Sequence, residues 1–175
     1  ETGYDILFFW VARMIMMTEY VMETKPFDQV YLHGLIRDEH GKKMSKSASN
    51  GIDPISMIEK FGTDAVRLSL IIGATPGNDL SLSETKIGGY RNFVNKLWNI
   101  SRFILTSVDN VRLVTESPEG ITMSDRWILQ RLQQTVDSVT TMIEKKQFSL
   151  AAEHLYNFTW SELADWYLEI AKVLN

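Results

Sequence analysis

The chain has 175 residues, of which 45% are hydrophobic, and a net charge of −4. This length suits one or two domains with an ample core. The charge excludes a protein that binds nucleic acid over its whole surface, so any RNA contact must come from a local basic patch. The absence of cysteine excludes disulfides, thiol catalysis and cysteine-ligated zinc. No metal-ligand spacing and no apolar run long enough to span a bilayer is present, so we predict neither a metal site nor a membrane segment.

The first predicted elements are a helix and a β-hairpin. Apolar residues at three- and four-residue steps predict a helix over residues 6–23, with Asp5 as its N-cap after a turn at the N-terminus. This helix has a methionine-rich face that we expect to be exposed. A β-branched and aromatic run predicts a strand at about 29–37. The turn residues 38–41 then favour a short return strand at 42–44.

The rest of the chain is predicted to be helical, with helices over residues 54–61, 64–72, 83–108, 124–146 and 149–173 and a linker at 109–120. Pro54 suits a first helical turn, Gly62 suits a C′ position and Thr63 suits an N-cap. We expect the last two helices to form an antiparallel pair joined at Gln147. In the last helix the apolar residues in register, which we expect to pack, are Leu155, Phe158, Trp166 and Ile170.

A basic segment follows the predicted hairpin. Residues 41–47 read Gly-Lys-Lys-Met-Ser-Lys-Ser. Lysine ammonium groups and serine hydroxyls on a loop can bind polyphosphate oxygens. The segment is not a Walker A loop, because the second glycine that would precede the Lys-Ser pair is missing. On composition alone, a solvated basic loop without a ligand is the favoured interpretation.

A second candidate site lies at the start of the first helix, where the sequence reads Gly3-x-Asp5-Ile6-x-x-x-Trp10. An aspartate at a helix start can accept two hydrogen bonds from a ribose diol, and Gly3 lets a ligand approach the backbone closely. Ile6 and Trp10 lie one turn apart and could wall a small apolar pocket. The alternative, favoured by the sequence alone, is that Asp5 only caps the helix and that Ile6 and Trp10 are core residues.

The predicted helix over 83–108 is basic, since no acidic residue occurs between Glu84 and Asp109. Aromatic and asparagine side chains alternate with the basic ones. Such a helix can contact a phosphate backbone, although a solvated face over an aromatic core explains the pattern equally well. The basic residues are Lys86, Arg91, Lys96 and Arg102.

The segment Lys43-Met44-Ser45-Lys46-Ser47 matches, letter for letter, the second signature of class I aminoacyl-tRNA synthetases, and the chain as a whole resembles the valyl enzymes of that class. The resemblance implies a mainly α fold. Residues 1–52 would form the C-terminal end of a Rossmann-like α/β catalytic domain with a short strand or hairpin. Residues 53–117 would form a helical stem-contact region, and residues 118–175 the start of an α-helical anticodon-binding bundle.

The resemblance also implies roles for individual residues. Lys43 and Lys46 would be catalytic, because they would stabilise charge developing on the pyrophosphate. Ile6 and Trp10 would line the amino-acid pocket. The implied ATP-binding residues are Gly3, Asp5, His33, Gly34, Met44, Ser45 and Ser47. The implied tRNA-binding residues are Lys86, Arg91, Lys96 and Arg102.

For the parent enzyme the resemblance implies activation of valine with ATP and Mg²⁺, transfer to tRNA(Val), a monomeric state and a cytoplasmic location. The chain lacks a His-x-Gly-His motif and an editing domain, so we expect an inactive piece of a longer protein that could self-associate. The nearest alternative is an isoleucyl or leucyl enzyme. Ile6 argues against it, because isoleucyl enzymes typically have glutamine there. A non-catalytic helical RNA-binding module is the rival from another class.

Overall fold

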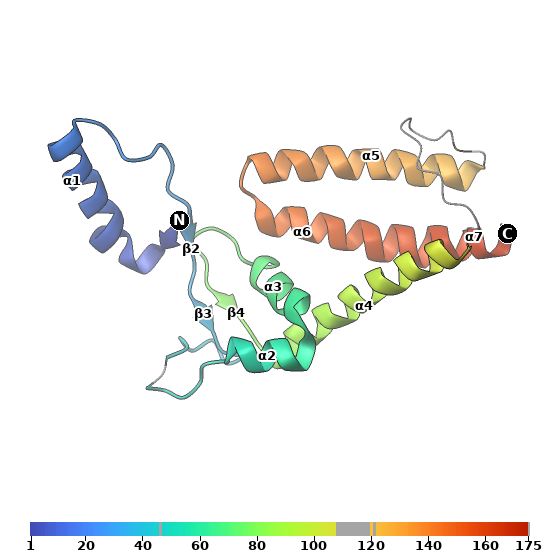
Figure 1. Cartoon of the computed structure of the whole chain (residues 1–175), viewed down its shortest axis with the longest axis horizontal. Helices are drawn as coiled ribbons and strands as arrows, with labels where there is room; N and C mark the ends of the chain where they lie inside the picture. The colour runs from blue at the N-terminus through green and yellow to red at the C-terminus, as the bar shows by residue number, and fades with distance from the viewer. Residues whose placement is uncertain (46, 108–119, 121, 175) are drawn as a thin grey trace. The chain divides into compact units, whose positions relative to one another are not determined.

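The computed structural model describes residues 1–45, 47–107, 120 and 122–174 (Figure 1). The chain forms two compact units. The first contains residues 1–53 and 73–83, and the second contains residues 54–72 and 84–175. No helix within the described ranges has the length and apolar character needed to cross a membrane.

The first unit is built on short parallel strands. The carbonyl of Tyr31 accepts a hydrogen bond from the Thr2 amide at 3.0 Å, and the carbonyl of Leu32 accepts one from the Gly77 amide at 2.9 Å. Successive carbonyls of an extended strand point to opposite edges, so the segment containing these two residues lies between the other two. The strands are β1 (Thr2–Gly3), β2 (Leu32–His33), β3 (Ile36–Arg37) and β4 (Leu80–Ser81), paired β1 with β2 and β3 with β4.

The predicted first helix is present but irregular. A 3₁₀ turn, η1 (Tyr4–Ile6), and a π-helical segment, η2 (Phe8–Ala12), precede the regular helix α1 (Arg13–Met22). The predicted turn over residues 2–5 was wrong for Thr2 and Gly3, which pair with β2 as a strand, whereas Tyr4 and Asp5 lie in the 3₁₀ turn η1. The prediction that Asp5 caps the helix was also wrong, since Gly3 occupies the N-cap of η1 and no side chain caps it.

The expected exposure of the methionine-rich face is confirmed. The most exposed large apolar side chains of this region are Phe8, Met16, Met17, Tyr20, Val21 and Met22, with 61–86% of their surface accessible.

The predicted strand at 29–37 is divided into β2 and β3 at Gly34. A Cβ atom at Gly34 would overlap the backbone of Asn78, so the chain passes against residues 78–79 there. The predicted hairpin is confirmed only as a turn and a single antiparallel bridge between Arg37 and Lys43. Strand β4 was missed, because it is only two residues long and directly follows turn-forming residues, so the short alternation over residues 80–83 did not indicate a strand.

The second unit begins with the helices α2 (Pro54–Phe61), α3 (Thr63–Ile71) and α4 (Glu84–Ser107). These bounds agree closely with the predicted ones. Gly62 has φ 89° and donates to the carbonyl of Ile58, as expected of a residue that ends a helix. Thr63 was predicted to cap α3 but is its first residue, and Gly62 occupies the N-cap.

The predicted antiparallel helix pair is confirmed (Figure 1). Helix α5 (Met123–Glu144) begins with a capping box in which Thr122 and Asp125 exchange side chain-to-backbone hydrogen bonds. The returning arm consists of α6 (Phe148–Asn157), the π-helical segment η3 (Phe158–Tyr167) and α7 (Leu168–Leu174). The predicted linker at 109–120 lies outside the described residues, except for Gly120.

The core of the second unit includes Ile100 of α4 against Ala164 of η3 and Leu168 of α7. Phe158 is buried as predicted, but the prediction was wrong for Leu155, Trp166 and Ile170, which are 47%, 65% and 36% exposed. The π-helical segment η3, which contains both Phe158 and Trp166, has a wider turn than an α-helix. Residues placed by a 3.6-residue period are therefore rotated out of the predicted face after Phe158, which explains Trp166 and Ile170 but not Leu155, since Leu155 precedes η3.

Candidate active site

The carboxyl ends of β1 and β2 bring three of the predicted ATP-binding residues together. Gly3 lies opposite His33 in the parallel register. A Cβ atom at Gly3 would lie 2.8 Å from Oδ1 of Asp5 and 3.5 Å from Cε1 of His33. Gly3 is itself buried, and the lack of a side chain there lets the exposed Asp5 carboxylate and His33 imidazole lie close to its backbone.

The basic loop reaches the same place. Nζ of Lys43 lies 3.4 Å from Oδ2 of Asp5, a residue 38 positions earlier in the chain. This contact joins the two candidate motifs, which are far apart in the sequence. Opposite charges in this geometry hold the Lys43 ammonium at the end of β1, where a negatively charged ligand could take it over.

Asp38 and Asn50 hold the base of the loop. Oδ1 of Asp38 accepts from the backbone amides of Lys42 at 2.8 Å and His40 at 3.0 Å. Oδ2 accepts from Nδ2 of Asn50 at 2.8 Å. These donors, with the Asn50 amide first, hold the pKa of Asp38 below its ordinary value, so the carboxylate stays ionised and accepting.

The predicted ATP-binding residues Met44 and Ser45 are half-buried at the start of the loop. The Ser45 amide donates to Oδ1 of Asn50 at 3.0 Å, and Oγ of Ser45 accepts from the Ala48 amide at 3.2 Å. Oγ of Ser47 lies 3.2 Å from Oγ of Ser45. The serine side chains therefore fold the loop back on itself, and the predicted catalytic residue Lys46 lies outside the described residues.

A second polar network lies on the other side of the interrupted strand. Asp79 accepts from the Leu35 amide at 2.8 Å and from Nε of Arg37. The Leu35 amide is the largest influence that lowers the pKa of Asp79, and Arg37 and the Tyr4 hydroxyl act in the same direction. This network ties the backbone after Gly34 to the loop before β4.

Sequence reasoning missed Arg37, Asp38, Asn50 and Asp79 as site residues. The turn sequence around Asp38 and the Asn50-Gly51 pair were visible as turn signals, and a search for side chains able to bind the loop backbone would have found both. Asp79 carried no such signal, because its partners are reached only through the pairing of β3 with β4.

The predicted amino-acid pocket residues lie on an open face. A side chain carbon of Ile6, Cγ1, would be 3.9 Å from a Cβ atom at Gly3, so Ile6 borders the Asp5 site. Ile6 is 39% exposed and Trp10 is 59% exposed. Ile6 lies in η1 and Trp10 in η2. Because both side chains are exposed, the described residues form one wall of the predicted pocket and no opposing wall.

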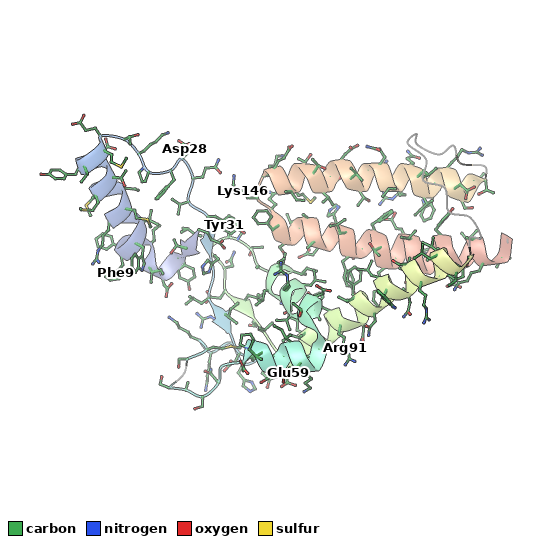
Figure 2. The ribbon with its side chains drawn as sticks, viewed as in Figure 1. Phe9, Asp28, Tyr31, Glu59, Arg91 and Lys146 are labelled. Carbon is green, nitrogen blue, oxygen red and sulfur yellow. The ribbon has the colours of Figure 1, made fainter. Side chains whose placement is uncertain are left out.

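The four predicted tRNA-binding residues of α4 differ in their surroundings. Arg91 and Arg102 are exposed, and Figure 2 shows Arg91 on α4. Lys86 is half-buried, and burial lowers the pKa of its ammonium group. Lys96 pairs with Asp165, and its Nζ lies 4.4 Å from the centroid of the Trp160 ring. The Lys96 ammonium is therefore already engaged by a carboxylate and an aromatic ring within the second unit.

Two protein-family models match the chain. Residues 1–83 match the family model described as tRNA synthetases class I (I, L, M and V), and residues 125–175 match the anticodon-binding domain of tRNA ligase. This chain belongs to the class I aminoacyl-tRNA synthetases. The resemblance seen in the sequence is therefore confirmed, as is the mainly α fold with a few short strands.

Within the class I synthetases, the chain is 52% identical to a valine–tRNA ligase of Pseudothermotoga lettingae over 99% of its length and 50% identical to one of Latilactobacillus sakei over 98%. It spans 20% of the length of each of these relatives. A leucyl-tRNA synthetase of Agrobacterium radiobacter K84, solved as a ternary complex with tRNA and LeuAMS, superposes with a TM-score of 0.73. The identity is 23%, covering 90% of this chain and 21% of that one, so this likeness concerns the fold. A methionyl-tRNA synthetase of Mycobacterium tuberculosis superposes with a TM-score of 0.71 at 24% identity. The superposition covers 90% of this chain and 31% of that one.

Proposed function

We propose that this chain contributes half of the adenylate-forming site and part of the tRNA-binding surface of a valine–tRNA ligase. The observation that supports this most directly is the contact between Lys43 and Asp5. It places the signature loop at the carboxyl end of β1, which is where open α/β sheets bind their ligands. The identity to valine–tRNA ligases over nearly the whole chain favours valine over isoleucine or leucine as the amino acid.

In this proposal Asp5 and the backbone at Gly3 receive the ribose of ATP, and His33 and Gly34 border the nucleotide. Lys43 leaves Asp5 for the phosphates, where its ammonium stabilises the charge that develops on the pyrophosphate. Met44, Ser45, Lys46 and Ser47 complete the loop. Mg²⁺ is proposed as the counter-ion of the ATP phosphates, with no residue of this chain assigned to it.

Amino-acid selection would fall to Ile6 and Trp10. An apolar wall suits a branched aliphatic side chain. Such a wall separates side chains that differ by one methylene only about 10- to 200-fold. The proposed pocket therefore needs a further selection step elsewhere in the full-length ligase.

The proposed tRNA contact lies on α4. Arg91 and Arg102 are 11 residues apart, which is about three helical turns, so they share a face with Asn95 and with Trp98, which is 72% exposed. Guanidinium groups beside an exposed aromatic ring suit a sugar–phosphate backbone and an unstacked base. Lys86 and Lys96 would contribute less, since one is half-buried and the other is paired.

We also propose the assignment of residues 1–52 to the catalytic domain, 53–117 to the stem-contact region and 118–175 to the anticodon-binding bundle. A cytoplasmic location and a monomeric full-length enzyme belong to the same proposal. The two family matches, which cover residues 1–83 and 125–175, support the catalytic and anticodon-binding parts.

The decisive experiment is ATP–pyrophosphate exchange by a full-length ligase that carries this segment, measured with valine, isoleucine and leucine. We expect valine to support the fastest exchange, and Lys43→Ala and Lys46→Ala each to reduce it by about 10²- to 10³-fold. Lys42→Ala is the matched control, because Lys42 is exposed and adjacent. Exchange that does not need valine, or that survives both substitutions, would overturn the proposal.

A further inference from the structure

A single amide side chain binds the signature loop on both sides of Met44. Oδ1 of Asn50 accepts from the Ser45 amide at 3.0 Å, while Nδ2 donates to the Lys43 carbonyl at 3.3 Å. The same Nδ2 donates to Oδ2 of Asp38 at 2.8 Å. Asn50 is half-buried, so these contacts are partly shielded from water. We call the Asp38–Asn50 pair, with its bonds to residues 43 and 45, the loop bracket.

The Asn50 amide can form the hydrogen bonds of the loop bracket in only one of its two orientations. Oδ1 of Asp38 is committed to two backbone amides, and Oδ2 is an acceptor that requires a donor from Asn50. Rotating the Asn50 amide by 180° would place its oxygen against Asp38 and its nitrogen against the Ser45 amide. Both contacts would then be mismatched, because an oxygen would face an oxygen and a donor would face a donor. Asp38 thus selects the orientation in which Asn50 can hold the loop.

We propose that Asn50, oriented by Asp38, is a positioning residue for adenylate formation. It fixes the backbone at positions 43 and 45, so that the Lys43 ammonium and the Ser45 hydroxyl start from defined places when ATP arrives. The inference rests on the proposed function of the loop. A lysine side chain has four rotatable bonds, and anchoring its backbone reduces the entropy lost when its ammonium meets the phosphates.

The bracket acts on the first part of the loop. Asn50 binds the backbone at positions 43 and 45, whereas the Ser47 side chain is exposed and lies against the Ser45 hydroxyl. In the proposed function, residues 43 and 45 contact ATP and not the amino acid. Loss of the bracket should therefore impair the use of ATP and leave amino-acid binding unchanged. The expected signature is a lower kcat and a higher KM for ATP with an unchanged KM for valine.

A residue swap tests the bracket in the full-length ligase. Asn50→Asp places two carboxylates face to face, and Asp38→Asn places two amide donors face to face. Each single variant should reduce kcat/KM for ATP in the exchange reaction by about tenfold or more, which corresponds to about 1.4 kcal/mol. The double variant restores a donor opposite an acceptor, although with the roles reversed. It should recover at least half of the loss on a logarithmic scale, missing only the bond to the Lys43 carbonyl.

Asn78→Asp is the matched control, since it adds the same charge on an exposed loop of the same unit. A second readout does not depend on activity. The Ser45 amide should exchange its hydrogen faster in Asn50→Ala than in the parent, as measured by hydrogen exchange over residues 43–50. Wild-type activity in the single variants, no recovery in the swap, or unchanged exchange at Ser45 would each overturn the inference. Absence of valine-dependent exchange in the parent enzyme would overturn the proposed function instead.

Discussion

Gly34 occupies a position where the fold leaves no room for a side chain. A Cβ atom there would overlap the carbonyl group of Asn78 and come within 2.7 Å of the amide nitrogen of Asp79. These are backbone atoms. They are held in place by the hydrogen bond from the Leu35 amide to the Asp79 carboxylate and by the pairing of β3 with β4. The glycine therefore serves the close approach of two chain segments, whatever its contact with a nucleotide.

Gly34→Ala should destabilise the protein strongly, because the clash can be relieved only by moving backbone. We expect a loss of about 3 kcal/mol or more, at the upper end for overpacking. Thermal or chemical unfolding measures it. Gly51→Ala is the control, since a Cβ atom at Gly51 meets nothing within 4 Å. Equal stability of the two variants would contradict this account of β3.

At the scale of elements, one ion pair joins α5 to η3. Nε and Nη2 of Arg131 donate to the two carboxylate oxygens of Glu162 at 2.6 and 2.7 Å. This hydrogen bonding lowers the pKa of Glu162 below its ordinary value. A carboxyl group with a lowered folded-state pKa stabilises the fold above its unfolded pKa, roughly 4.3. That stabilisation is lost as the pH falls through the folded-state pKa.

Glu162→Gln should therefore lower the free energy of unfolding at pH 7 by about 1 kcal/mol, a value limited by the partial exposure of the pair. The difference from the parent should shrink between pH 5 and pH 3, about where carboxyl groups titrate. Denaturant unfolding at three pH values checks this. Glu144→Gln, at the exposed end of α5, is the control. A constant difference over this range would rule out the ion pair as its source.

Elements with a regular period were the ones that the sequence predicted well. Helices α2 to α5 follow from apolar spacing and from Pro54 and Gly62, which act locally. Strand β4 is too short for its alternation to stand out, and the π-helical segments η2 and η3 do not follow the 3.6-residue period, so periodicity does not reveal them. The signature loop was predictable from its letters, and Asp38 and Asn50 each carried a turn signal. The contact between Asp38 and Asn50 and the Arg37–Asp79 pair required the folded structure.

At the scale of the whole molecule, the proposed function assigns separate tasks to the two units. The loop and its bracket lie in the first unit, and the basic face of α4 lies in the second. Substitutions should therefore separate two measurements. Lys43→Ala should abolish most pyrophosphate exchange and leave tRNA affinity nearly unchanged. Changes on α4 should weaken tRNA binding and leave exchange intact.

Neutralising the exposed face of α4 tests this division. The double variant Arg91→Gln/Arg102→Gln in the full-length ligase should weaken tRNA binding and flatten its salt dependence. The slope of the logarithm of the binding constant against the logarithm of the salt concentration is negative. Its magnitude should decrease by about 0.7 to 0.9 for each phosphate that the protein no longer neutralises. Lys96→Gln removes a similar charge that already pairs with Asp165 and faces Trp160. It should lower stability by weakening the packing on Trp160 and change the salt slope much less. An unchanged salt slope in the double variant would contradict a tRNA contact on α4. An equal change of the slope in Lys96→Gln would show that the effect comes from long-range charge rather than from contact on this face.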